Sequence, residues 1–335
     1  MLSFQTMQND AQIKQAAAIL REGGIVAFPT ETVYGLGARV FDPSAISRIY
    51  QIKGRPNDNP LIVHIADKNQ LLLLASSIPE KADALIQQFW PGPLTLVLKK
   101  SETVPAMVSA NLETVAIRMP NHPVALALLN ALNEPIAAPS ANRSGRVSPT
   151  CAAHVRESLG NNIDFILDGG PCTVGLESTV LDLTSDPPTL LRPGAITMEA
   201  IEAVIGPIVL FQNSTQTAAS PGINHSHYQP ACSVVLVDQY ALHIALGDHL
   251  RSEKRLGMIS FQNGQRALRG QEMDRSLFAY TRVMTDLSDY ARNLFAAFHE
   301  AEEANVEILL VEKVIKTGLG LAIMDRLERA ALSKS

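Results

Sequence analysis

Three polar side chains of complementary chemistry lie close together in one short segment. Lys53, Arg55 and Asn59 fall within seven positions of KGRPNDNP, a segment that glycine and proline stiffen. Arginine presents a planar fork of donors and lysine a point charge, and this combination suits the several oxygens of a polyphosphate. The Walker A pattern GxxxxGKS/T does not occur in the chain. The simpler interpretation is a lysine that complements a helix macrodipole and an arginine in solvent.

A second polar segment, APSANRSGRVSPT, runs from residue 138 to residue 150 after a predicted strand. Ser140, Asn142 and Ser148 offer donors to a phosphate or a ribose. Thr150 is predicted to cap the helix that follows. Taken singly, each serine is better explained as a turn or cap residue.

Other predicted strand ends also carry polar residues. PTETVYGLG, residues 29–37, directly follows a strand and would put hydroxyls and bare backbone N–H groups at a sheet edge, where α/β proteins bind ligands. A plain turn explains this segment equally well. Arg118 closes a strand and is suited to a carboxylate, and residues 177–179 and 191–194 repeat the pattern. His64, within LIVHI, is by itself more typical of a hydrogen-bonded core residue.

Together these residues predict an anion-binding site without a nucleophile. No Ser-His-Asp order is recognisable, and Cys151, Cys172 and Cys232 have no activating neighbours in the sequence. The pair His225-x-His227 has the spacing of two metal ligands, but we interpret it as incidental. Lysine, arginine and small polar side chains favour nucleotidyl or phosphoryl transfer, in which positioning and charge stabilisation supply most of the catalysis.

The composition restricts the class of protein. The 335 residues carry a formal net charge of −5, from 28 basic and 33 acidic residues, which disfavours a protein that coats nucleic acid. Three cysteines without a CxxC pair exclude a zinc ribbon and a disulfide framework, and suit a reducing cytoplasm. Asp10 and Lys14 interrupt the N-terminal segment where a signal peptide needs an apolar core. No apolar stretch reaches membrane-spanning length, so we expect a cytoplasmic protein without a membrane partner.

The elements that would position these side chains fall into two domains, as the length also favours. Between Ile205 and Pro230 there is no Asp, Glu, Lys or Arg, and turn-forming polar residues are abundant, which predicts a linker. We therefore predict a first domain over 1–205, a linker over 206–230 and a second domain over 231–335.

The first domain is predicted to be α/β with a mixed sheet. Asn9 or Asp10 is expected to cap a helix through Leu20, and Asp42-Pro43 to open a helix that Gly54 stops. Segments rich in Val, Ile and Leu predict strands at 25–29, 61–65, 94–99, 114–119, 135–140, 164–169, 178–183 and 189–193.

The second domain is predicted to be a smaller, Rossmann-like α/β unit. Strands are expected at 233–238, 256–261 and 307–312, and Ala291, Leu294, Phe295 and Phe298 follow the spacing of a core-facing helix near 288–305. GLGLAI at 318–323 lacks the third glycine of a dinucleotide fingerprint, so we expect a structural or regulatory domain.

Seven motifs occur in an order that resembles the YrdC-like domain: PTETVYGLG, KGRPNDNPLIVHI, PGPLTLVL, VAIRMPNHP, APSANRSGRVSPT, DGGPCTVGLESTVLDL and LLRPGAIT. The similarity covers about residues 10 to 205 and continues into the second domain. More narrowly, the chain resembles the long, two-domain form of the L-threonylcarbamoyladenylate synthase family, with a YrdC-like twisted mixed sheet.

The resemblance implies an enzyme of tRNA modification. Such nucleotidyltransferases condense L-threonine, bicarbonate and ATP into threonylcarbamoyl-AMP and pyrophosphate. A separate threonylcarbamoyl transferase complex then modifies the adenosine beside the anticodon of tRNA. Mg²⁺ would be carried by the ATP phosphates, without protein side chains as ligands. Direct binding of tRNA is expected to be weak at most.

The resemblance also implies site residues. The family's KxR…SxN signature corresponds to the expected catalytic residues Lys53, Arg55, Ser140 and Asn142. Threonine would contact Thr32, His64, Arg118, the backbone of Ala138, and Ser178. ATP would lie against Lys53, Arg55, Asn59, Thr114, Ser140, Asn142, Ser148 and Arg192.

Tyr228 matches the HYxP motif of the family's linker, which folds over the nucleotide pocket. The chain departs from the family pattern around it. Ser226 stands where a basic residue is common, His225 where an aromatic is common, and Gln229 where alanine is common. We expect a working lid over ATP with weaker phosphate contacts.

Three other functions remain open from the sequence. One is an RNA-binding or ribosome-associated YrdC-like module, which the net charge of −5 and scattered basic residues disfavour. Another is carbamoyl transfer in hydrogenase maturation, whose proteins carry zinc-finger cysteines that this chain lacks. A diverged regulatory paralogue is disfavoured by the complete signature.

Overall fold

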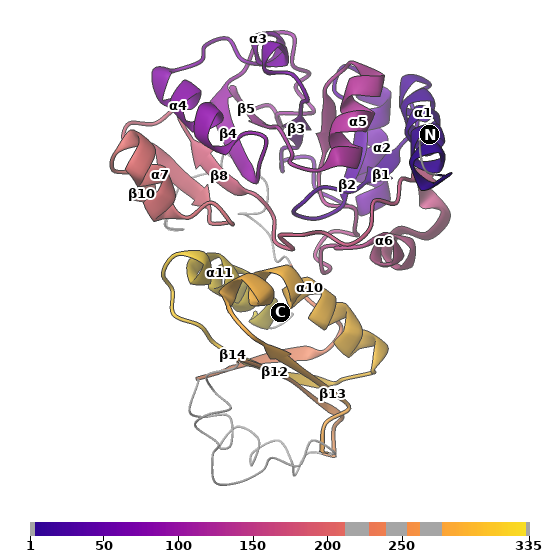
Figure 1. The fold of residues 1–335 in the computed structure, drawn as a ribbon, viewed down its shortest axis with the longest axis vertical. Coiled ribbons are helices and arrows are strands. Elements are labelled where there is room, and N and C mark those ends of the chain that lie inside the picture. Colours follow the sequence, from indigo (N-terminus) through magenta and orange to yellow (C-terminus); the bar gives the residue numbers. More distant parts are fainter. Residues whose placement is uncertain (1–3, 212–227, 239–252, 262–276, 333–335) are drawn as a thin grey trace. The chain divides into compact units, whose positions relative to one another are not determined.

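The computed structural model describes residues 4–211, 228–238, 253–261 and 277–332 (Figure 1). They form two compact units. The first comprises residues up to 144, 148–173 and 177–211, and the second comprises 145–147, 174–176 and the described residues from Tyr228 onward.

The first unit is built on one ten-stranded mixed sheet. Its strands, in spatial order, are β10 (Val209–Leu210), β9 (Thr189–Arg192), β8 (Thr179–Asp182), β4 (Leu94–Lys99), β5 (Thr114–Arg118), β3 (Ile62–His64), β6 (Ile136–Ala138), β2 (Gly35–Arg39), β1 (Val26–Phe28) and β7 (Phe165–Ile166). The pairs β10–β9, β8–β4, β5–β3 and β1–β7 are parallel, and the others are antiparallel. The predicted mixed α/β fold is confirmed.

Helices cover the sheet of the first unit and pack on its two larger hydrophobic clusters. They are α1 (Phe4–Arg21), α2 (Pro43–Lys53), α3 (Leu71–Leu74), α4 (Glu80–Phe89), α5 (Pro123–Leu132), α6 (Ala152–Leu159) and α7 (Met198–Ile205), with short 3₁₀ turns at Lys68–Gln70 and Gly160–Asn162. Successive residues of a strand point to opposite faces of the sheet, so the side chains of β1 are shared between the two clusters. Val26 and Phe28 join α1 and α5, which lie side by side in Figure 1, whereas Ala27 joins the core under α2 and α4.

Helix α2 begins and ends as the sequence predicts. The Asp42 carboxylate accepts a hydrogen bond from the Ala45 N–H at 3.0 Å, and Gly54 ends the helix in the left-handed conformation at φ 60°. Glycine adopts this conformation with the least strain. As a result, Lys53 is the last helical residue and Arg55 begins the loop.

Three local predictions are wrong. Helix α1 begins at Phe4 rather than at a cap on Asn9 or Asp10, since no proline or glycine stops the helix earlier. Cys151, not Thr150, is the N-cap residue of α6. The third wrong prediction is the ligand-binding turn at Gly35 and Gly37.

Gly35 and Gly37 belong to strand β2 rather than to a ligand-binding turn. Gly37 pairs with Val26 of β1 in the antiparallel ladder. A Cβ at Gly37 would lie 2.8 Å from Cγ2 of Ile136 and 2.9 Å from Cε1 of Phe28. This glycine therefore permits close packing in the core, and its backbone N–H is not free for a ligand.

The second unit has a four-stranded parallel sheet, as its Rossmann-like alternation predicts. The spatial order is β11 (Ser233–Val237), β14 (Ile308–Glu312), β12 (Leu256–Phe261) and β13 (Tyr280–Met284). Strand β13 was not predicted because its sequence, YTRVM, interleaves polar and apolar residues at the sheet edge. Helices α10 (Leu287–Glu303) and α11 (Leu319–Ala331) pack on each other, and the predicted stripe on α10 is buried.

Candidate active site

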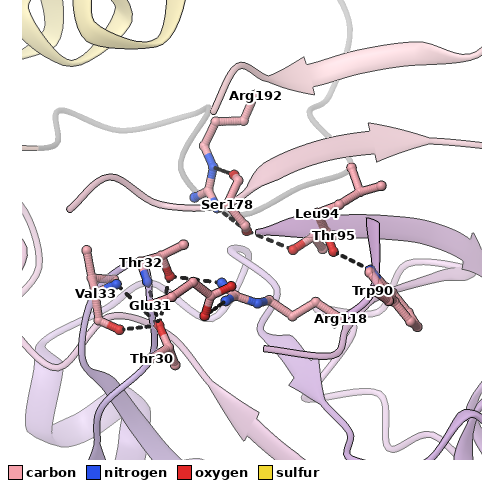
Figure 2. Close-up of polar contacts among 10 residues, drawn as sticks. All are labelled: Thr30, Glu31, Thr32, Val33, Trp90, Leu94, Thr95, Arg118, Ser178 and Arg192. Carbon is pink, nitrogen blue, oxygen red and sulfur yellow. Dashed lines mark hydrogen bonds and ion pairs between the residues drawn. The ribbon is translucent and has the colours of Figure 1, made fainter. Parts of the chain in front are cut away.

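One corner of the site joins the loop after β1 to the end of β5. The Arg118 guanidinium forms an ion pair with Glu31, Nη2 to Oε2, at 2.7 Å, and its Nη1 donates a hydrogen bond to Thr32 Oγ1 at 2.9 Å (Figure 2). Thr30 Oγ1 lies 2.8 Å from Thr32 Oγ1 and donates to the Val33 carbonyl at 2.7 Å. The ion-paired side chains are 3% and 4% exposed. The corner therefore combines buried opposite charges with small hydroxyls.

A second corner is centred on Ser178, just before β8. Its hydroxyl lies 2.8 Å from Thr95 Oγ1 of β4. Arg192, which ends β9, donates from Nε to the Ser178 carbonyl at 3.0 Å and from Nη2 to the Ser178 hydroxyl at 3.2 Å (Figure 2). The family resemblance assigned Ser178 to threonine and Arg192 to ATP. In the structure the two side chains are hydrogen-bonded to each other.

His64 lies beside Arg118, because β3 and β5 are parallel neighbours that pair these two residues. The Nδ1 atom of His64 is 3.1 Å from the Ile62 carbonyl, which makes it the donor when the ring is neutral. Burial, reinforced by the Arg118 charge, lowers the pKa of His64 to about 3. At neutral pH this side chain is therefore an uncharged hydrogen-bonding group.

Lys53 links the two polar segments KGRPNDNP and APSANRSGRVSPT. Its ammonium donates to the carbonyls of Ser140 and Asn142, each at 2.5 Å. Burial, with a further contribution from Arg55, holds the pKa of Lys53 well below its ordinary value, and Glu177 opposes this shift. An anion that binds beside Lys53 would favour its charged form.

Arg55 and Asn59 lie in the loop that follows Lys53. Arg55 donates from Nε to the Asn59 carbonyl at 3.2 Å and from Nη2 to the Pro60 carbonyl at 3.0 Å, which braces the loop. The Asn59 side-chain amide is buried, and neither its oxygen nor its nitrogen has a hydrogen-bond partner among the described residues. A buried amide without partners is expensive to maintain unless a ligand satisfies it.

Other predicted site residues are more dispersed. The Ser148 hydroxyl donates to the Glu177 carboxylate at 2.5 Å. Ala138 ends β6 and pairs with Ile62 of β3. Thr114 begins β5, so it lies about 13 Å along the strand from Arg118 at the other end.

Tyr228 lies in the second unit as the structure describes it. Its ring stacks on Phe295, with centroids 5.3 Å apart at 27°, and Arg326 Cζ is 5.6 Å from the ring centroid. This ring is a buried part of the second unit's core, and its role on ATP stays a prediction. His225 and Ser226, the departures from the family pattern, lie outside the described residues.

Comparison with known proteins assigns the family. The family model Sua5_yciO_yrdC, described as telomere recombination, matches residues 18–194, and the model for the threonylcarbamoyl-AMP synthase C-terminal domain matches residues 196–332. Threonylcarbamoyl-AMP synthase of Pyrococcus abyssi is 45% identical over 330 residues, which cover 96% of this chain and 94% of the relative. The Bacillus subtilis synthase is 46% identical over 329 residues, with the same shares covered. The chain belongs to the Sua5 family.

A solved Sua5 structure agrees with this assignment. The crystal structure of P. abyssi Sua5 complexed with L-threonine matches with a TM-score of 0.89 at 44% identity, over 96% of this chain and 94% of that one. The predicted fold is thereby confirmed. The predicted function as a threonylcarbamoyl-AMP synthase is confirmed by the curated relatives that carry this name. The RNA-binding and hydrogenase-maturation alternatives are disfavoured, since full-length relatives carry the synthase name.

Sequence reasoning missed two residues that this Sua5 site brings together. Glu31 was treated as part of a turn, although a carboxylate between two threonines after a buried strand was a visible signal. Thr95 interrupts the apolar run LTLVL, and a lone hydroxyl there indicates a buried hydrogen bond.

Two kinds of feature are absent from the described residues. No group of three His, Cys, Asp or Glu side chains gathers there to hold a metal ion. No helix in the same part of the chain is long and apolar enough to cross a membrane.

Proposed function

We propose that this protein condenses L-threonine, bicarbonate and ATP into threonylcarbamoyl-AMP and pyrophosphate through the residues of the first unit. The observation that carries the proposal is the buried Arg118 guanidinium beside Thr32 and His64. A guanidinium in such a pocket suits an amino acid carboxylate. Support comes from the P. abyssi relative, whose structure is complexed with L-threonine.

In this proposal the two hydroxyl corners receive threonine. Arg118 binds the carboxylate of threonine. Thr32, Ser178 and the Ala138 carbonyl lie near the amine and the hydroxyl of threonine. His64 stays neutral, so it offers a hydrogen bond without adding charge near Arg118.

In this proposal ATP lies against Lys53, Arg55 and Asn59. Lys53 and Arg55 neutralise phosphate charge. The side-chain amide of Asn59, which has no partner among the described residues, forms a hydrogen bond with the nucleotide. Asn142, Ser140, Ser148, Thr114 and Arg192 complete the assigned set. In this proposal Mg²⁺ would be carried by ATP rather than by protein side chains, and it would supply further positive charge at the phosphates.

The chemistry needs positioning and charge more than a protein nucleophile. The threonine amine adds to CO₂ derived from bicarbonate and, after loss of a proton, gives a carbamate. A carbamate oxygen then attacks the α-phosphorus in line as the bond to pyrophosphate breaks. Lys53 and Arg55 stabilise the charge that develops on the leaving group.

The product is a reactive mixed anhydride, which a downstream transferase can consume. We propose a hand-off to a threonylcarbamoyl transferase complex in the cytoplasm, with weak direct tRNA binding at most. A tRNA gel shift at moderate salt checks the last point. Tight binding without ATP or threonine would favour the RNA-binding alternative instead.

A pyrophosphate-release assay tests the reaction, with threonine, bicarbonate and ATP omitted in turn. Release should require all three. Lys53→Ala and Arg55→Ala should each abolish it, and Lys81→Ala, at a half-exposed lysine of α4, should not. Full activity in both site variants would refute the phosphate assignment.

A further inference from the structure

The Glu31–Arg118 pair is buried, yet part of its hydrogen-bonding capacity is unused. Nη2 and Oε2 are 2.7 Å apart and partner each other as an ion pair. Nη1 donates to Thr32. Among the described residues, Oε1 of Glu31 and Nε of Arg118 have no hydrogen-bond partner. One acceptor on the anion and one donor on the cation therefore remain open in one buried place.

An arrangement of this kind is costly in an empty protein. Desolvation of two ions is repaid only when good geometry and further hydrogen bonds satisfy the remaining donors and acceptors. The open group on Arg118 is a donor on a cation, and that on Glu31 is an acceptor on an anion. A ligand that carries both a carboxylate and an ammonium group would satisfy both.

We infer that Glu31 binds the ammonium group of the amino acid substrate while Arg118 binds its carboxylate. This rests on the proposed function, because L-threonine is the zwitterion in question. The ligand carboxylate would take the open Nε donor of Arg118, and the ammonium would donate to the open Oε1 of Glu31. The pair thereby selects α-amino acids over carboxylates that lack an amine.

Other side chains near Glu31 do not supply a competing charge. His122 and Cys172 are both buried and close enough for the charge of Glu31 to affect their pKa values. Burial lowers the pKa of His122 and raises the pKa of the Cys172 thiol, so both are neutral at pH 7. Glu31 is thus the anion that faces Arg118 in this corner.

Calorimetric binding with two ligands tests the assignment. L-threonine carries the amine, and 3-hydroxybutanoate keeps the carboxylate and hydroxyl but lacks it. Glu31→Gln should weaken L-threonine binding by about tenfold or more, the loss expected for one charge-assisted hydrogen bond. Binding of 3-hydroxybutanoate should stay equal or tighten, because Arg118 no longer has an internal carboxylate beside it. Glu80→Gln, at an exposed position of α4, is the matched control and should change neither.

The outcomes separate the inference from the proposed function. An equal loss for both ligands means that Glu31 only positions Arg118, and the inference is overturned. If Glu31→Gln fails to fold, the affinities of the wild-type protein for the two ligands test the inference. The wild type must then bind L-threonine about tenfold more tightly than 3-hydroxybutanoate. Equal affinities would overturn the inference and leave the proposed function standing, whereas no binding of L-threonine would overturn both.

Discussion

His64 should make the first unit sensitive to acid. The side chain is 4% exposed, and burial beside Arg118 lowers its pKa to about 3, against about 6.5 in the unfolded chain. Between these values the unfolded chain binds a proton that the folded chain does not. Stability is therefore highest above pH 6.5 and falls as the pH drops. The loss from this group is about 1 kcal/mol at pH 5.5 and about 3 kcal/mol at pH 4.5.

His64→Asn removes the titrating group and keeps an N–H donor for the Ile62 carbonyl, which His64 Nδ1 now contacts. Urea unfolding at pH 7.0, 5.5 and 4.5 measures the free energy of unfolding. Trp90 is the single tryptophan and lies buried in the first unit, so its fluorescence reports on that unit. Between pH 7.0 and pH 4.5 the variant should lose about 3 kcal/mol less stability than the wild type.

The comparison between two pH values cancels the cost of the substitution itself, such as altered packing. His154→Asn, at a half-buried position of the same unit, serves as the matched control. Parallel pH curves for wild type and His64→Asn would refute the reasoning. They would mean that His64 reaches solvent or gains a partner when protonated.

Three further outcomes follow from particular contacts. Gly194→Ala should destabilise the first unit by about 1–3 kcal/mol in thermal unfolding, because a Cβ would lie 2.4 Å from the Thr179 nitrogen; wild-type stability would contradict that close approach. Asp42→Ala should cost about 1 kcal/mol through the lost N-cap of α2, and an unchanged melting temperature would show that the cap contributes nothing. Tyr228→Ala should destabilise the second unit by about 3 kcal/mol through loss of the Phe295 stack, whereas Tyr228→Phe should keep it. If Tyr228→Ala leaves ATP turnover and KM unchanged, the lid role is wrong.

The strands with continuous apolar sequence were predictable. LTLVLK and EILLVE form β4 and β14, because long Val, Ile and Leu runs are buried on both faces of a sheet. Strand β2 was not predictable in this way, since GLGAR carries little apolar surface of its own. It becomes a strand because it pairs with β1 on one side and β6 on the other, and Phe28 and Ile136 leave room only for glycine at residue 37.

The candidate site was predictable in its residue types and not in its pairings. Lysine, arginine and hydroxyl residues at the predicted strand ends indicate anion binding by their chemistry alone. The partner of Arg118 was not indicated, because Glu31 lies 87 positions earlier and only the sheet order brings the two together. In the same way Ser178 and Arg192 looked like parts of two subsites, and adjacent strands unite them.

The sequence by itself determined the family, the order of the motifs and the kinds of groups that face the substrates. Only the tertiary structure decided the state of those groups: a neutral His64, a Lys53 held on two backbone carbonyls, and a carboxylate beside Arg118. The physical reason is that protonation and pairing depend on desolvation and on distances of a few ångströms. Both quantities are set by which strands become neighbours, and residue spacing along the chain does not contain them.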